Sequence, residues 1–137
     1  MQIAVVYIGN APLIVECAKT FVKELSNKRH FVTLINGILE KPRMGQFQYI
    51  MFFVQSDNLF EKIYYTKLTT FFNEVGNINA KYASLFTDRK FLGDRSFNLY
   101  MKKIESEGLI LHETEIFKNT KEIELIAKDF EPIKFGD

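Results

Sequence analysis

Runs of apolar residues alternate with segments of helical periodicity along most of the 137-residue chain. Residues 2–8 and 49–54 are almost entirely apolar and too short to be independent helices. Such runs are typical of strands that are covered on both faces of a parallel sheet, whereas residues 109–117 alternate partway along, as an edge strand does. We therefore expect five strands, at residues 2–8, 30–36, 49–54, 81–86 and 109–117.

Apolar residues recur at helical spacing between most of these strands. Pro12 predicts the start of the first helix, because its missing N–H costs nothing at that position. Two pairs at the spacing of a capping box, Asn58 with Glu61 and Asn119 with Glu122, predict two further helix starts. The helical apolar stripes lie within residues 14–25, 68–75, 97–104 and 123–130.

The connection at residues 37–47 is broken by Pro42 and Gly45 and has room for one or two helical turns. Elsewhere strand and helix alternate, and parallel strands need right-handed crossovers. The chain is therefore expected to form a three-layer α/β/α sandwich with helices on both faces of a parallel sheet. Because no linker or internal repeat interrupts the pattern, we expect residues 1–137 to form a single domain.

Composition narrows the classes of partner. The formal net charge is +1 and the basic residues form no run, which argues against a protein that binds nucleic acid. The longest apolar stretches have the length of strands, so we expect no membrane span. The N-terminus lacks the features of a secretory leader, and we expect a cytoplasmic protein.

Few residues suggest catalytic or metal chemistry. Cys17 has no cysteine to pair with, and its place near the apolar stripe of the first helix favours a buried core residue. His30 and His112 have no partners at metal-ligand spacing. No nucleophile has an evident base, and Asp57 lacks the acidic pair after the first strand that a receiver domain would need. These observations favour a carrier or a binding module over a catalyst.

The turn after the first strand is the first place to expect a ligand, because a helix start offers unpaired N–H groups in an open α/β sheet. It consists of Gly9 and Asn10, followed by Ala11 and Pro12. At this turn and beyond it, the order of landmarks resembles the flavodoxin family over essentially the whole chain. The similar segments are residues 1–25, 47–54, 67–72, 82–87 and 96–108.

The resemblance implies strand order 2-1-3-4-5, with three loops gathered around flavin mononucleotide (FMN). Gly9 and Asn10 match the Gly-Asn of the family's phosphate loop, so the amides of Gly9, Asn10 and Ala11 are implied phosphate donors. Phe91 is the implied ring contact, and Asp88 resembles the acidic residue of the third loop. The implied cofactor-binding residues are Gly9, Asn10, Ala11, Ser56, Asp57, Thr87, Asp88, Phe91 and Gly93.

The turn also departs from the family pattern. It is about two residues shorter, Ala11 replaces a threonine, and the hydroxyls that precede Gly9 in the family are missing. Each charge-assisted hydrogen bond lost to a phosphate is worth roughly 1.5–3 kcal/mol. Three basic residues lie in or beside the predicted loop after the fourth strand: Arg89, Lys90 and Arg95. They either supply phosphate contacts that the first turn lacks or belong to a solvated loop of mixed charge.

Two hypotheses for function follow. In the first, the protein binds FMN and transfers electrons to a redox partner protein, with the cofactor supplying the redox chemistry. In the second, it is a flavin-free module of the same fold that binds a protein partner or another small ligand. A quinone or nitro reductase is a third hypothesis, although such enzymes normally have longer chains.

Overall fold

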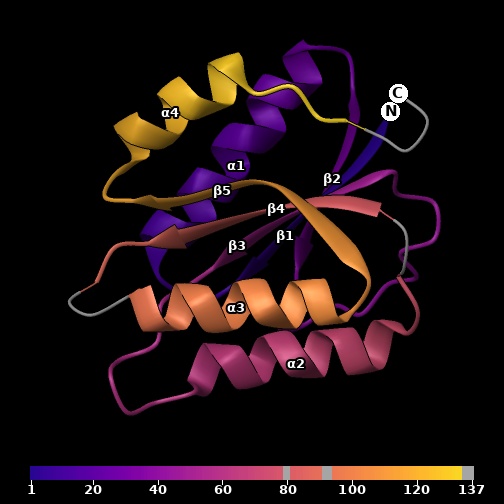
Figure 1. Cartoon of the computed structure of the whole chain (residues 1–137). Coiled ribbons are helices and arrows are strands. Elements are labelled where there is room, and N and C mark those ends of the chain that lie inside the picture. The colour runs from indigo at the N-terminus through magenta and orange to yellow at the C-terminus, as the bar shows by residue number, and fades with distance from the viewer. Residues whose placement is uncertain (79–80, 91–93, 134–137) are drawn as a thin grey trace.

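The chain folds into a five-stranded parallel sheet between two layers of helices (Figure 1). This is a computed structural model that describes residues 1–78, 81–90 and 94–133. The strand order is β2-β1-β3-β4-β5, so the predicted three-layer α/β/α sandwich and its strand order are confirmed. In chain order the elements are β1 (Gln2–Ile8), α1 (Pro12–Asn27), β2 (Phe31–Asn36), β3 (Tyr49–Val54), α2 (Ile63–Val75), β4 (Lys81–Asp88), α3 (Asp94–Ser106), β5 (Leu109–Phe117) and α4 (Thr120–Asp129).

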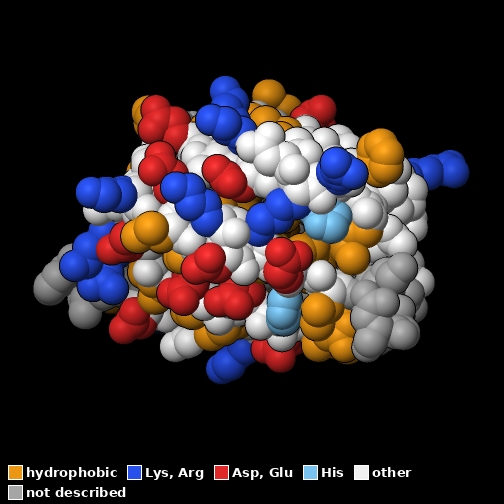
Figure 2. Space-filling model, turned by 90° about the horizontal axis from the view of Figure 1, so that it is seen from above, with side chains coloured by type: hydrophobic (Ala, Val, Ile, Leu, Met, Phe, Trp, Pro, Cys, Tyr) orange, Lys and Arg blue, Asp and Glu red, His pale blue; other side chains and the backbone are white. Residues whose placement is uncertain are grey.

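Helices α1 and α4 cover one face of the sheet, and α2 and α3 cover the other (Figure 1). The chain changes face between β1 and β3, because β1 leads into α1 whereas β3 leads into α2. Seen from the side of α1 and α4, basic and acidic side chains are interspersed over the surface (Figure 2). Within the described part of the chain, no helix combines the length and the apolarity needed to cross a membrane.

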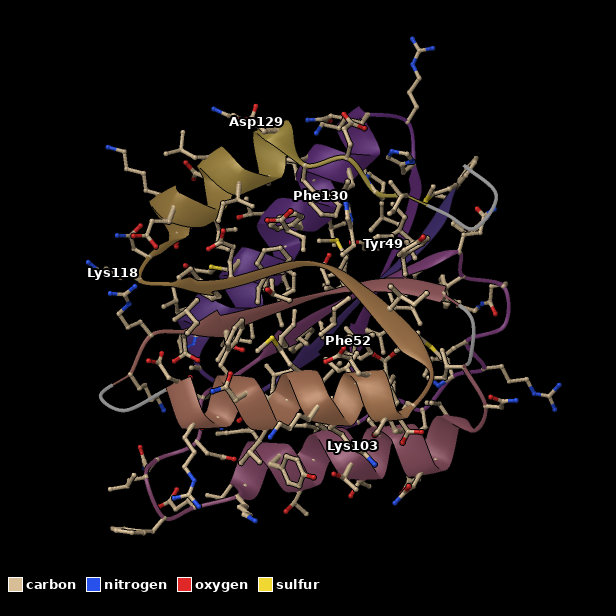
Figure 3. The ribbon with its side chains drawn as sticks, viewed as in Figure 1. Tyr49, Phe52, Lys103, Lys118, Asp129 and Phe130 are labelled. Atoms are coloured by element: carbon tan, nitrogen blue, oxygen red, sulfur yellow. The ribbon has the colours of Figure 1, made fainter. Side chains whose placement is uncertain are left out.

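Each face of the sheet has its own hydrophobic core, because successive side chains of a strand point to opposite faces. On the α1 and α4 side, the ring of Phe21 lies 5.4, 5.0 and 5.5 Å from the rings of Phe53, Phe86 and Phe130. Phe52, the neighbour of Phe53 in β3, lies on the α2 and α3 side (Figure 3). The all-apolar sequence of β3 thus serves both cores.

Three element boundaries differ from the sequence prediction, and the smallest difference is that β2 begins at Phe31 and not at residue 30. Strand β4 continues through Thr87 and Asp88, which the sequence suggested were loop residues, because Val54 of β3 pairs with Thr87 and β5 pairs with both. Helix α2 begins at Ile63 and not at Asn58, so the predicted capping box does not start it. No helix is described between β2 and β3, where the sequence predicted at most two turns.

Candidate functional site

The predicted site residues that the structure describes gather at one edge of the sheet. Ile8, Val54 and Thr87, at or near the ends of three neighbouring strands, are register partners. The carboxyl ends of β1, β3 and β4 therefore lie together. This arrangement brings into one region Gly9, Asn10, Ala11, Ser56, Asp57, Thr87 and Asp88. The predicted contributions of Phe91 and Gly93 lie outside the described residues.

The side chain of Gln55 fills the turn between β1 and α1. Its Oε1 accepts hydrogen bonds from the backbone N–H groups of Asn10 and Ala11, each at 3.0 Å. The Gln55 N–H donates to the Ile8 carbonyl at 2.8 Å, which anchors the residue beside the turn. At Gly9, φ is 150°, and a Cβ there would lie 2.6 Å from Gln55. Position 9 therefore requires glycine for two reasons: other residues rarely adopt this backbone conformation, and a side chain there would collide with Gln55.

The other amides at the start of α1 offer little to a ligand. The N–H groups of Ile14 and Val15 both donate to the Ala11 carbonyl, at 3.1 and 3.3 Å. Pro12 has no N–H group, and the N-cap residue, Ala11, makes no side-chain hydrogen bond that would cap the helix. Among the described residues of the turn and this helix start, Gly9 and Leu13 keep N–H groups without a hydrogen-bond partner. The anion site expected at this terminus is thus partly occupied from within the protein, because Gln55 takes the amides of Asn10 and Ala11.

Ser56 and Asp88 bind each other across the ends of β3 and β4. The Ser56 N–H donates to Oδ1 of Asp88 at 2.7 Å, and the Ser56 hydroxyl donates to the Asp88 carbonyl at 2.5 Å. Lys90 adds a third link, because its Nζ donates to the Ser56 carbonyl at 3.1 Å. Both Ser56 and Asp88 are buried. Their polar groups therefore join two strands rather than facing an open site.

Asp57 caps helix α2. Its two carboxylate oxygens accept the N–H groups of Tyr64 and Tyr65, at 2.8 and 3.1 Å. The Asp57 N–H donates to the hydroxyl oxygen of Ser96 at 3.2 Å, which ties the same residue to α3. A carboxylate at a helix N-terminus is favoured both by these hydrogen bonds and by the helix dipole. Sequence reasoning placed Asp57 at the site but missed this role, which depends on the loop folding back.

Two buried hydroxyls complete the inner side of this edge. Tyr100 donates its hydroxyl proton to the Gln55 carbonyl at 2.8 Å, and burial together with the nearby Asp57 carboxylate raises the pKa of Tyr100. The Thr87 hydroxyl is fully buried and has no hydrogen-bond partner in the described part of the chain. Since Thr87 is not exposed, it cannot contact a ligand without a rearrangement of β4.

A cavity of about 450 Å³ opens beside the turn, where the chain changes face between β1 and β3. It lies between the ends of β1 and β2 and the first turns of α1 and α2. Its apolar lining includes Tyr7, Val15, Ile38, Leu39, Ile63 and Tyr64. Crevices at such a switch point are the usual ligand sites of open α/β sheets, and this volume falls within the usual range of roughly 300–1,000 Å³.

Comparison with solved structures finds flavodoxins that share this architecture. A flavodoxin from the domain Archaea matches with a TM-score of 0.70 and 16% identity, over 94% of this chain and 95% of its own. Flavodoxin 2 from Bacillus cereus matches with a TM-score of 0.72 and 12% identity, over 93% and 95%. Megasphaera elsdenii flavodoxin matches with a TM-score of 0.72 and 13% identity, over 93% and 99%.

The chain has the flavodoxin-like fold. No model of a protein family matches the sequence, and no curated protein sequence matches it. At these identities the structural likeness extends to the fold, and the site must be judged on its own atoms.

The turn of this flavodoxin-like fold does not fit the phosphate of FMN as it stands. A backbone N–H has one proton to donate, and those of Asn10 and Ala11 are given to Gln55. No serine or threonine hydroxyl lies between Gly9 and Pro12 to replace them. A phosphate at this turn would have to displace Gln55 first.

A second polar cluster lies away from the predicted site, on the α1 and α4 side of the sheet. The Tyr49 hydroxyl forms hydrogen bonds with the Ser84 hydroxyl and, at 2.9 Å, with Nδ1 of His112. A break in the β4–β5 register at Ala83 and Ser84 leaves His112 without a partner in the ladder. The centre of the Tyr49 ring also lies 5.7 Å from the centre of the Phe130 ring (Figure 3). Because Ser84 is fully buried, the cluster joins strands and does not present a nucleophile.

Cys17 is fully buried in the α1 and α4 core, as predicted, and burial raises the pKa of its thiol to about 12. Within the described ranges, no three His, Cys, Asp or Glu side chains are grouped so that they could hold a metal ion.

Proposed function

We propose that this protein is a binding module of flavodoxin-like fold that takes a small ligand other than FMN at the carboxyl edge of its sheet. The observation that carries the proposal is the position of Gln55, whose Oε1 accepts the amides of Asn10 and Ala11. These amides belong to the segment that, by the resemblance, would hold the phosphate of FMN.

The energetic argument compares Gln55 with a phosphate as the acceptor. Phosphate would have to break two existing hydrogen bonds and leave the Gln55 amide without them. It would receive no serine or threonine hydroxyl from the turn in exchange and would find Pro12 where another residue would offer an N–H. The usual gain of roughly 1.5–3 kcal/mol per charge-assisted hydrogen bond is therefore offset at this turn.

The polar residues after β3 and at the end of β4, where the resemblance would place the flavin ring, support the same proposal. Ser56 and Asp88 bind each other, and Asp57 binds the start of α2. A ring placed beside Ser56, Asp57 and Asp88 would meet side chains that already have partners. The cavity at the switch point, in contrast, is lined by apolar groups with open space beside them.

FMN binding with electron transfer to a redox partner protein is the competing function, and the likeness to solved flavodoxins supports it. That function requires Gln55 to rotate out of the turn when FMN binds. The two functions differ in one measurable property, which is the affinity of the unmodified protein for FMN.

The test is a titration of FMN with the purified protein, followed by quenching of flavin fluorescence. We expect no flavin absorbance band and no quenching at micromolar protein. Gln55→Ala frees two amides and is expected to bind FMN about tenfold more tightly than the parent, since each amide is worth roughly 0.5–1.5 kcal/mol. Quenching by the parent with a micromolar dissociation constant would overturn the proposal.

Gln48 offers a matched control. Its Oε1 also accepts a backbone N–H, that of Gln2, at 2.9 Å, but at the opposite edge of the sheet. Gln48→Ala should leave FMN affinity at the parent level. A second variant, Gln55→Glu, keeps an acceptor for both amides and adds a negative charge, so it should bind FMN no better than the parent.

A further inference from the structure

The switch-point cavity combines an apolar wall with a small group of polar side chains. Tyr7, Val15, Ile38 and Ile63 supply rings and branched aliphatic groups from four different elements or their ends. Leu39, at the cavity as well, leaves 79% of its surface exposed, and Ile63 leaves 49%. Large apolar side chains in contact with water at the wall of a cavity favour a ligand with an apolar body.

The amide side chains of the cavity have their oxygen atoms already engaged. Oδ1 of Asn36 accepts the backbone N–H groups of Ile38 and Leu39, at 3.1 and 3.4 Å. Oδ1 of Asn10 accepts the hydroxyl proton of Tyr64 at 3.2 Å. What each asparagine retains for a ligand is its NH₂ group, which can only donate.

Lys67 adds a positive charge to these donors. It lines the cavity from α2, and within the described residues it has no hydrogen-bond or ion-pair partner. None of the described residues that line the cavity is acidic. Glu40 does not line the cavity; its exposed carboxylate accepts the Asn36 backbone N–H at 2.7 Å and keeps its negative charge outside the lining. The polar side of the cavity thus presents hydrogen-bond donors and one cation.

We propose that this cavity binds a monocarboxylate with a bulky apolar body. Lys67 and the NH₂ groups of Asn36 and Asn10 are the donors for the carboxylate, and the apolar wall covers the body of the ligand. One lysine and two amide groups suit a single negative charge better than a phosphate dianion, which is usually held by several cations or by free helix-start amides. This inference rests on the proposed function and names its class of ligand.

The test uses 2-naphthoate and its neutral counterpart 2-naphthamide, titrated into the ¹⁵N-labelled protein and followed by backbone amide shifts. We expect 2-naphthoate to shift the amides of residues 36–39 and 63–67. We also expect it to bind up to about fivefold more tightly than 2-naphthamide, because an ion pair with an exposed lysine such as Lys67 contributes at most about 1 kcal/mol. Lys67→Gln should remove that preference and Lys67→Arg should keep it. Lys102→Gln, an exposed lysine on α3, should leave it unchanged.

Several outcomes would overturn the inference. Equal affinities for 2-naphthoate and 2-naphthamide would refute the proposal that the site recognises a carboxylate. Shifts confined to other parts of the chain would refute the proposal that the ligand binds in this cavity. A preference that survives Lys67→Gln would refute the assigned cation. A parallel titration with FMN keeps the two proposals separate. Shifts at residues 9–11 together with flavin quenching would refute the proposed function, whatever 2-naphthoate does.

Discussion

The strongest quantitative prediction concerns Asp57 and the start of helix α2. The sequence pattern indicated Asn58 and Glu61 as the capping pair, whereas in the structure the Asp57 carboxylate accepts the Tyr64 and Tyr65 amides, at 2.8 and 3.1 Å. Asp57 is 6% exposed, so water cannot readily replace it. Asp57→Ala therefore leaves two amides at the helix start without their acceptor.

The expected magnitude follows from those two hydrogen bonds. A bond to a charged group contributes about 1.5–3 kcal/mol, and removing the carboxylate also relieves part of its desolvation cost. We expect Asp57→Ala to lower the free energy of unfolding by about 2–3 kcal/mol, which for this chain length lowers Tm by roughly 6–12 °C. Asp57→Asn keeps one acceptor oxygen and should cost about 1 kcal/mol.

The assay is urea unfolding followed by far-ultraviolet circular dichroism, with m-values compared between variants. Asn58→Ala and Glu61→Ala are the matched controls. Their side chains are exposed and bond each other at 3.3 Å, so each change should cost less than about 0.5 kcal/mol. A loss below about 1 kcal/mol for Asp57→Ala, or a larger loss for Asn58→Ala, would refute the assignment of the cap.

Three further predictions concern other parts of the molecule. Burial raises the pKa of Cys17 to about 12. Ellman's reagent should therefore label this thiol in denaturant but not in the native protein at mildly alkaline pH, and rapid labelling of the native protein would contradict the burial of Cys17. Phe21→Ala should lower the free energy of unfolding in urea by about 3–5 kcal/mol. Phe31 is 69% exposed, so Phe31→Ala should cost under about 0.5 kcal/mol. Similar losses for Phe21→Ala and Phe31→Ala would contradict the placement of Phe21 in the core. Gly9→Ala should lower the free energy of unfolding by about 1–3 kcal/mol, because the new Cβ would lie 2.6 Å from Gln55. A thermal melt with the same Tm as the parent would disprove this close approach.

The candidate site was predicted in its location and only partly in its contacts. The turn at Gly9 and the residues after β3 and β4 were expected to meet, since the carboxyl ends of parallel strands share an edge. Gln55 was not among the predicted site residues, although its amide side chain directly after a buried strand was the available signal. Its oxygen bonds Asn10 across 45 positions of the chain, and no local pattern specifies such a pair.

The alternation of strands and helices could be predicted from the order of residues alone, since burial on two faces produces continuous apolar runs and burial on one face produces helical stripes. Together with the rule for crossovers, that alternation predicted the three-layer sandwich. The capping pair Asn119 and Glu122 was also predictable, and Oδ1 of Asn119 accepts the Glu122 N–H at 3.0 Å. In that case the donor and acceptor are three residues apart, and helix geometry alone brings them together.

The groups that occupy the edge of the sheet depend instead on contacts between distant segments. The fold of the loop after β3 determines whether Asp57 or Asn58 caps α2, and the packing of β3 beside β1 determines that Gln55 fills the turn at Asn10. These outcomes depend on distances between segments that the chain brings together only when the sheet forms. The physical reason is that periodic burial is a local property of the sequence, whereas a hydrogen bond between distant residues requires the whole fold.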